Sequence, residues 1–280
     1  MAVERSYYLG THDEEIRRLG IQHRVWRPHV LDAWRRAGIT VGSTVIDAGA
    51  GPGYASLELA EIVEETGKVL ALERSERFIE ALSKAAAARG LANIETRNLD
   101  LVTDAIPAEG VDAVWIRWVF AFLSDPIEVL SKLAGALSPA REGAHARPGG
   151  VIVIHEYMDW GTLNWTPRHP ALTDFVEVAI REWRASGGEP DIAVQLLPML
   201  PKAGLRLKET RPIIHAVKPD NYVWRWPATF IPNHARYLAK SGAVTTEWAE
   251  EVVREFAAAE ADPNTVMTTP LVMEIIAERV

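Results

Sequence analysis

Short apolar runs alternate with longer segments whose apolar residues recur at helical spacing, and this alternation fills much of the first half of the chain. Strands are predicted at residues 43–47, 68–73, 93–97, 111–117 and 150–155, and helices at residues 54–65, 76–89 and 126–137. Strands that alternate with helices of this length are typical of a parallel sheet with helices on both faces. The runs AVWI and VIVIH are almost continuously apolar, which indicates strands buried on both sides.

A helical pattern precedes the first predicted strand. Thr11 and Glu14 have the spacing of a capping box, and the apolar positions that follow predict helices over about residues 13–37. Gly38 ends this pattern. Ser75 and Gly90 are likewise expected to cap the helix at residues 76–89.

The regular alternation of predicted strands and helices ends after Asp159. An irregular stretch is followed by predicted helices at residues 171–184 and 193–202, an extended segment at 205–217, a mostly helical segment at 224–259 and a strand at 270–280. The last strand of the sheet is therefore expected at the end of the chain, after a mostly helical segment. The predicted organisation is an N-terminal helical cap at 1–40, a core at 41–217 with a lid segment at 159–190, a helical substrate cap at 218–264, and the last core strand at 265–280.

Composition narrows the possible functions. The net charge is −8 and no dense block of lysine or arginine is present, which disfavours nucleic acid as a partner. The chain has no cysteine, so disulfides, thiolate metal sites and cysteine nucleophiles are excluded. We find no signal-peptide pattern and no apolar run near the roughly 20 residues that span a bilayer, and we expect a soluble, cytoplasmic protein without a membrane span.

The stretch VIDAGAGPGYASLEL, residues 45–59, places a glycine-rich turn between a strand and a helix. Glycines allow the backbone to approach a ligand closely. A dinucleotide site normally has a third glycine where Tyr54 stands, and Asp47 would put a negative charge beside a pyrophosphate. S-adenosylmethionine (SAM) carries a cationic ammonium and sulfonium and no phosphate, so the sequence favours SAM over a dinucleotide.

Two more acids follow successive strands. Glu73 ends the second strand, where a carboxylate can accept hydrogen bonds from both ribose hydroxyls. Asp100 follows the third strand, with Leu101 beside it, and is placed for the adenine amino group. Three acids at consecutive strand ends make a chance arrangement of surface carboxylates a poor explanation.

The sequence resembles the class I SAM-dependent methyltransferases in VIDAGAGPG, LALE, NLD and RPGGVIVIHE. It is more narrowly similar to bacterial small-molecule methyltransferases related to ubiquinone and menaquinone biosynthesis, in YYLGTHDEEIRRLGIQ, DAVWIRWVFAFLSDP and HEYMD. The loop before the fifth strand is longer than is usual in that family. The resemblance implies an α/β, Rossmann-like, seven-stranded and mostly parallel sheet, with the last strand antiparallel, helices on both faces and a helical cap.

The resemblance also implies a cofactor site and a helical cap that covers it. The residues expected to contact SAM are Tyr7, Gln22, Asp47, Ala48, Gly49, Gly51, Gly53, Glu73, Arg74, Asp100, Leu101, Arg117 and Trp118. An alternative for the cap is a surface helix with an internal ion pair between Glu15 and Arg18.

Ligands of open α/β sheets bind at the carboxyl ends of the strands, so the residues that end the fourth and fifth strands are candidates for chemistry. His155 and Glu156 are the first candidates for a general base, and His23 is a third. Arg117 either pairs with Glu156 or orients an anionic group of the acceptor. Buried structural roles stay open for each histidine, and an amine or carbon acceptor needs no base.

No catalytic metal is expected, because Arg117 and Trp118 stand where carboxylate ligands would be needed. The ten tryptophans are either core residues or a wall around an apolar ligand, with Trp224, Trp226, Phe230 and His234 as candidates for its lining.

The favoured function is metal-independent methyl transfer from SAM to a small, partly apolar molecule. An NAD(P)-dependent oxidoreductase and a SAM-binding protein without methyl transfer stay as alternatives. Exposed aromatic residues are compatible with a homodimer.

Overall fold

The structure, a computed structural model, describes residues 13–140 and 148–280. The chain divides into two compact units, which are described separately below. The first unit takes in residues up to 116, residues 132–153 and residues 278–280, and the second takes in residues 117–131 and 154–277. The predicted Tyr7 contact lies outside the described residues.

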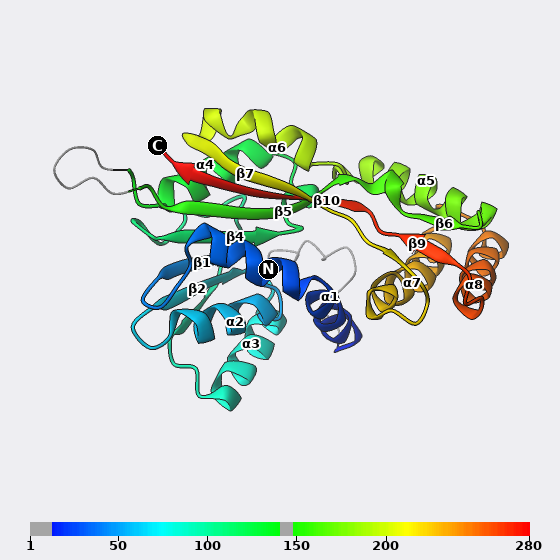
Figure 1. Cartoon of the computed structure of the whole chain (residues 1–280), viewed down its shortest axis with the longest axis horizontal. Helices are drawn as coiled ribbons and strands as arrows, with labels where there is room; N and C mark the ends of the chain where they lie inside the picture. Colours follow the sequence, from blue (N-terminus) through cyan, green and yellow to red (C-terminus); the bar gives the residue numbers. More distant parts are fainter. Residues whose placement is uncertain (1–12, 141–147) are drawn as a thin grey trace. The chain divides into compact units, whose positions relative to one another are not determined.

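The main sheet has seven strands in the order β3-β2-β1-β4-β5-β10-β7 (Figure 1). The strands are β1 (Thr44–Ala48), β2 (Lys68–Glu73), β3 (Ile94–Asn98), β4 (Ala113–Arg117), β5 (Val151–Asp159), β7 (Leu205–Ile213) and β10 (Leu271–Arg279). Strands β1, β2, β3 and β4 pair in parallel. The N–H of Arg279, at the end of β10, donates to the carbonyl of Gly150, immediately before β5, as an antiparallel pair requires. The predicted seven-stranded sheet with an antiparallel last strand is confirmed.

Helices alternate with the strands of the first unit as the sequence predicts. The helices that begin in this part of the chain are α1 (Asp13–Ala37), α2 (Tyr54–Val63), α3 (Glu76–Arg89) and α4 (Pro126–Ala136), the last of which crosses from the second unit. Both predicted caps of α3 are present: the Ser75 hydroxyl accepts from the N–H of Phe78, and Gly90 is left-handed at φ 69°.

The second unit adds a small sheet and further helices. The small sheet has the order β6-β9-β8, with β6 (Asn164–Thr166), β8 (Ala216–Val217) and β9 (Val266–Thr268). The helices are α5 (Pro170–Ala185), α6 (Ala193–Met199), α7 (Arg225–Ser241) and α8 (Thr246–Ala261). The sequence assigned residues 265–280 to one core strand, but β9 pairs with β6 and β8 instead. Pro270 has no N–H to continue a ladder, and β10 begins only after it.

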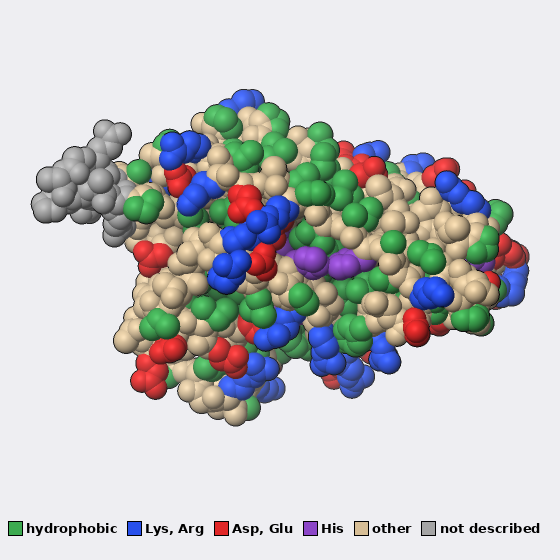
Figure 2. Space-filling view, in the orientation of Figure 1, with side chains coloured by type: hydrophobic (Ala, Val, Ile, Leu, Met, Phe, Trp, Pro, Cys, Tyr) green, Lys and Arg blue, Asp and Glu red, His purple; other side chains and the backbone are tan. Residues whose placement is uncertain are grey.

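Charged side chains of both signs are interspersed over the face drawn in Figure 2, in keeping with the absence of a basic block in the sequence. No helix in the described part of the chain has the length and apolar character needed to cross a membrane.

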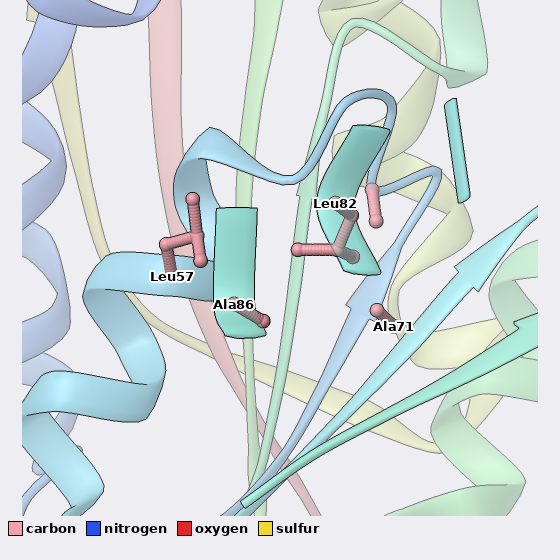
Figure 3. Packing of buried hydrophobic residues seen from close by; sticks show 5 residues of the cluster. Leu57, Ala71, Leu82 and Ala86 are labelled. Atoms are coloured by element: carbon pink, nitrogen blue, oxygen red, sulfur yellow. The ribbon is translucent and has the colours of Figure 1, made fainter. Parts of the chain in front are cut away.

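The glycine loop is packed directly against the helix that follows β2. Leu57 of α2, Leu82 and Ala86 of α3 and Ala71 of β2 form one buried cluster beside it (Figure 3). Gly53, immediately before α2, has φ 85°, and a β-carbon built there would lie 2.2 Å from Leu82 Cδ1 and 2.8 Å from Leu82 Cβ. Gly53 is therefore required both by backbone conformation and by packing.

Helix α1 docks on α2 through Tyr54, the residue that replaces the third glycine of a dinucleotide loop. The Tyr54 hydroxyl donates to the carbonyl of Ile16 at 3.0 Å. A β-carbon on Gly20 would lie 2.8 Å from the Tyr54 ring, and the His23 ring stacks on that ring with centroids 6.0 Å apart. Tyr54 therefore serves as the anchor of the N-terminal helix.

Glu58 of α2 completes this helix contact. Its Oε2 lies 3.1 Å from His23 Nε2, and its Oε1 accepts from Arg27. Burial acts to raise the pKa of Glu58, but the hydrogen bonds from His23 and Arg27 outweigh it and lower that pKa below its ordinary value of 4.5.

We expect Gly53→Ala to lower the free energy of unfolding by about 2–4 kcal/mol, because a left-handed alanine costs about 1 kcal/mol and overpacking against Leu82 costs about 1–3 kcal/mol more. Gly51→Ala is the matched control, since Gly51 has φ 56° and no atom within 4 Å of a built β-carbon. It should cost only the backbone strain of about 1 kcal/mol. Urea unfolding of both variants tests this, and equal losses would contradict the packing argument.

The Glu58 cluster predicts a pH-dependent stability. A carboxyl with a lowered folded pKa stabilises the fold above its ordinary pKa of 4.5, and this contribution is lost as the pH falls through the folded pKa. At pH 7, Glu58→Gln should reduce the free energy of unfolding by about 1–3 kcal/mol, and the deficit should shrink as the pH falls below 4.5. Urea unfolding at pH 7, 5 and 3.5 measures it, with Glu61→Gln, an exposed change on α2, as the control. A pH-independent deficit would contradict the ion-pair origin.

Candidate functional site

Asp47 is buried near the end of β1, and the first turn of α2 holds its side chain. The Ser56 hydroxyl donates to Asp47 Oδ2 at 2.5 Å, and both side chains are almost fully buried. The N–H groups of Gly49 and Ala50 both donate to the carbonyl of Leu72, which ties the loop to β2. The Ser56 hydroxyl therefore fixes one oxygen of the acid, and the loop that follows the acid is held to β2.

Glu73, the last residue of β2, bridges two backbone turns. Its Oε2 accepts from the N–H of Gly51 at 2.8 Å, and its Oε1 accepts from the N–H of Ser75 at 2.9 Å. Burial raises the pKa of Glu73, against the opposing effect of these backbone donors. Arg74, which follows it, is exposed.

Asp100 shapes the turn after β3. Its Oδ1 accepts from the N–H of Val102 at 2.8 Å, and its own N–H donates to Asp104 Oδ2 at 2.9 Å. Leu101 is buried beside it. Because β1, β2 and β3 are adjacent and parallel, Asp47, Glu73 and Asp100 lie along one edge of the sheet in the first unit.

The polar residues of α1 form a connected group. Both guanidinium contacts from Arg18 to Glu15 measure 2.6 Å, and Arg18 also donates to Gln22 Oε1 at 2.8 Å. Glu15 and Gln22 are buried. The internal ion pair offered as an alternative for this helix is present, and His23 is engaged with Glu58.

In the second unit, the side chain of Glu156 accepts hydrogen bonds from the turn that follows β4. Its Oε1 accepts from the N–H groups of Val119 and Phe120, at 2.7 and 2.8 Å. Burial raises the pKa of Glu156 to about 8, although backbone donors from Phe120, Val119 and Ala121 act to lower it. Within the described residues, these backbone groups take the place of the ion pair with Arg117 that the sequence offered as one alternative.

His155 faces a different partner from Glu156. Its Nε2 lies 3.0 Å from Glu274 Oε2 on β10, and the imidazole is fully buried. Adjacent residues of a strand point to opposite faces, so the two base candidates lie on opposite sides of β5. Both are held by protein groups.

Aromatic rings gather in the second unit around the ends of β4 and β5. Trp118 stacks on Tyr157 with centroids 5.3 Å apart, and on Trp226 at 6.2 Å. Arg117 lies over the Trp118 ring, 4.9 Å from its centroid. We call these four residues, with Trp160, Trp183 and Phe230, the aromatic cluster, since each makes a ring contact to another member.

The predicted lining residues separate in the structure. Trp226 and Phe230 belong to the aromatic cluster, whereas Trp224 packs on Phe256 at 5.9 Å. His234 stacks on Phe230 at 4.8 Å, and burial lowers its pKa to about 4. The contacts of Ser56 with Asp47 and of Trp183 with Tyr157 were not predicted, because only the three-dimensional structure brings these residues together.

The described residues contain no group of three or more His, Asp or Glu side chains arranged to hold a metal ion.

Residues 45–140 match a family model described as a methyltransferase domain. Over 154 residues the chain is 32% identical to aklanonic acid methyltransferase of Streptomyces sp. (strain C5), covering 55% of this chain and 66% of that protein. Over 135 residues it is 27% identical to demethylmenaquinone methyltransferase of Geobacillus stearothermophilus, covering 48% of this chain and 53% of that protein. The chain thus spans about half to two thirds of the length of these relatives.

The fold is also similar to that of solved structures. Coclaurine N-methyltransferase bound to N-methylheliamine and S-adenosylhomocysteine (SAH) aligns with a TM-score of 0.52 at 14% identity, over 88% of this chain and 70% of that one. This second similarity concerns the fold alone. Residues 45–140 therefore carry a methyltransferase domain, and the seven-stranded sheet has the fold of the class I SAM-dependent methyltransferases.

Proposed function

We propose that this protein transfers a methyl group from SAM to a small, partly apolar molecule, without a metal ion. The observation that carries the proposal is the row of acids Asp47, Glu73 and Asp100 at the ends of adjacent parallel strands, with the glycine loop between the first two. The names of the two curated relatives, both methyltransferases, support the reaction.

The residues of the first unit fit the cofactor. Gly51 has a left-handed backbone and open space where a side chain would lie, so a ligand can approach the loop. Asp47 offers a negative charge for the ammonium group, Glu73 offers acceptors for the ribose hydroxyls, and Asp100 offers one for the adenine amino group. Bound SAM would supply a methyl group on a cationic sulfur, ready for displacement. In this proposal Gln22, Ala48, Gly49, Gly53, Arg74, Leu101 and Tyr7 complete the contacts. Arg117 and Trp118, which were predicted from the sequence to contact SAM, are assigned to the acceptor instead.

The aromatic cluster supports an apolar or ring-bearing acceptor. Flat apolar side chains bind such molecules by burial and by stacking. Arg117 is positioned by Trp118 and would orient an anionic group of the acceptor.

Methyl transfer is an in-line displacement, to which an enzyme contributes mainly alignment and exclusion of water. His155, Glu156 and His23 all hold other protein groups. We therefore infer that these three position the site and that proton removal, where an acceptor needs it, is not their main contribution.

Ligand-induced thermal stabilisation tests the cofactor. We expect SAM and SAH each to raise the melting temperature, and NAD to leave it unchanged, because Asp47 disfavours a pyrophosphate and Tyr54 stands where a dinucleotide loop has its third glycine. A shift with NAD alone would overturn the proposal in favour of an oxidoreductase. Transfer of a labelled methyl group from SAM into a component of a cell extract tests the reaction. Tight SAM binding with no labelled product would favour a SAM-binding protein that does not methylate.

Asp47→Asn tests the role of the acid that precedes the glycine loop. Asparagine still accepts from Ser56 but loses the charge, so SAM should bind about tenfold or more weakly, which corresponds to roughly 1.4 kcal/mol or more. Asp112→Asn is the control, because Asp112 accepts from the N–H of Thr44 at the opposite end of β1. Calorimetric titration measures both. Equal affinities for Asp47→Asn and the wild type would show that Asp47 does not contact the ammonium.

A further inference from the structure

Three consecutive residues of β5 hold the turn that follows β4. The carbonyl of His155 accepts from the N–H of Trp118 at 3.1 Å. The carboxylate of Glu156 accepts from the next two N–H groups, those of Val119 and Phe120. The ring of Tyr157 stacks on the ring of Trp118, at an interplanar angle of 16°. Every one of these contacts lies within the second unit.

The turn needs this support because its first residue is strained. Trp118 has φ 51°, in the left-handed region that a bulky residue rarely adopts. Strained residues persist only where their surroundings fix them, and they concentrate at functional sites. The two N–H groups bound by Glu156 follow Trp118 directly, so the carboxylate fixes the backbone on the far side of the strained residue.

Glu156 itself is poorly suited to remove a proton from a substrate. It is 0% exposed, and one of its oxygens is already committed to two backbone donors. Burial also raises the pKa of Glu156 to about 8, so near pH 7 the carboxyl is largely protonated and cannot take a further proton.

We propose that Glu156 is a positioning residue for the acceptor: it holds the turn at residues 118–120, and thereby sets the place of the Trp118 ring and of the Arg117 guanidinium that lies over it. This inference rests on the proposed function, since it assigns Trp118 and Arg117 to acceptor binding. It assigns Glu156 a role through these residues and not in the chemical step.

The experiment compares Glu156→Gln with Glu156→Ala. Glutamine keeps an oxygen that can accept from Val119 and Phe120 but cannot serve as a base, and alanine removes the acceptor. Glu177→Gln on α5 is the control for the same substitution at an exposed position. If Glu156→Ala fails to fold by far-ultraviolet circular dichroism, Glu156→Asp takes its place, because its shorter side chain cannot reach both N–H groups.

The first measurement is the near-ultraviolet circular dichroism spectrum, which reports the fixed arrangement of the aromatic rings. The contribution of Trp118 is the difference between the wild type and Trp118→Phe. We expect Glu156→Gln to keep most of this contribution and Glu156→Ala to lose it. SAH affinity, measured by calorimetry, should stay within about twofold of the wild type in both, because the proposed SAM-binding acids belong to the first unit.

The second measurement is methyl transfer from labelled SAM to the extract component that accepts it. We expect Glu156→Gln to keep the rate within about tenfold. Glu156→Ala should lose about 100-fold or more in kcat/KM, mainly through a raised KM for the acceptor. A general base would behave differently, since its removal typically costs 10²–10⁴-fold in turnover even when the replacement is isosteric.

The outcomes separate the possibilities. A 100-fold loss in Glu156→Gln with an unchanged Trp118 spectrum would overturn the positioning role in favour of proton transfer. An unchanged Trp118 spectrum in Glu156→Ala would also overturn it. If SAH does not bind the wild type, the proposed function itself fails, and the spectra still decide whether Glu156 holds Trp118.

Discussion

Two turns at the carboxyl ends of strands leave backbone N–H groups that must find an acceptor, and the carboxylates of Glu73 and Glu156 provide it. Unpaired buried donors are costly, so nearly all such groups are paired in folded proteins. Glu73 accepts from Gly51 and Ser75, and Glu156 accepts from Val119 and Phe120. The same device therefore shapes a turn in the first unit and a turn in the second.

A carboxylate that binds a loop N–H group is also held where it can accept a hydrogen bond from a ligand. A carboxylate oxygen has two lone pairs, so Glu73 can hold a loop N–H and still accept from another donor. Asp47 is similar, with Ser56 on one oxygen. Side chains fixed in this way lose little rotamer entropy on binding, which is the advantage of a preorganised site. Burial raises the pKa of Glu73 and of Glu156, and in each case backbone donors oppose that rise.

Local patterns in the sequence predicted what depends on local chemistry. Ser75 and Gly90 cap α3 because a hydroxyl and a left-handed glycine do so in any helix, and the apolar runs gave the strands of the sheet. The sequence did not show which residues far apart along the chain would contact one another. In the sequence Tyr54 was notable only because it replaces a glycine, whereas in the structure α1 packs on it. Arg117, at the end of another strand, was the expected partner of Glu156, but Glu156 binds backbone groups instead. Likewise, nothing in residues 265–269 shows that β9 leaves the main sheet to pair with β6 and β8.

Each of the three candidate bases is already engaged with another group of the protein. His155 is held by Glu274, His23 by Glu58, and Glu156 by two backbone donors. A group that must exchange protons in each turnover needs access to its substrate, and a group that fixes the backbone needs constant partners. These demands conflict in a single buried side chain. In the proposed function fixed geometry matters more, because displacement at carbon depends on the alignment of the attacking atom, the methyl group and the sulfur. The turns that follow β1, β2 and β4, each held by hydrogen bonds from neighbouring strands, are compatible with the proposed catalysis by alignment.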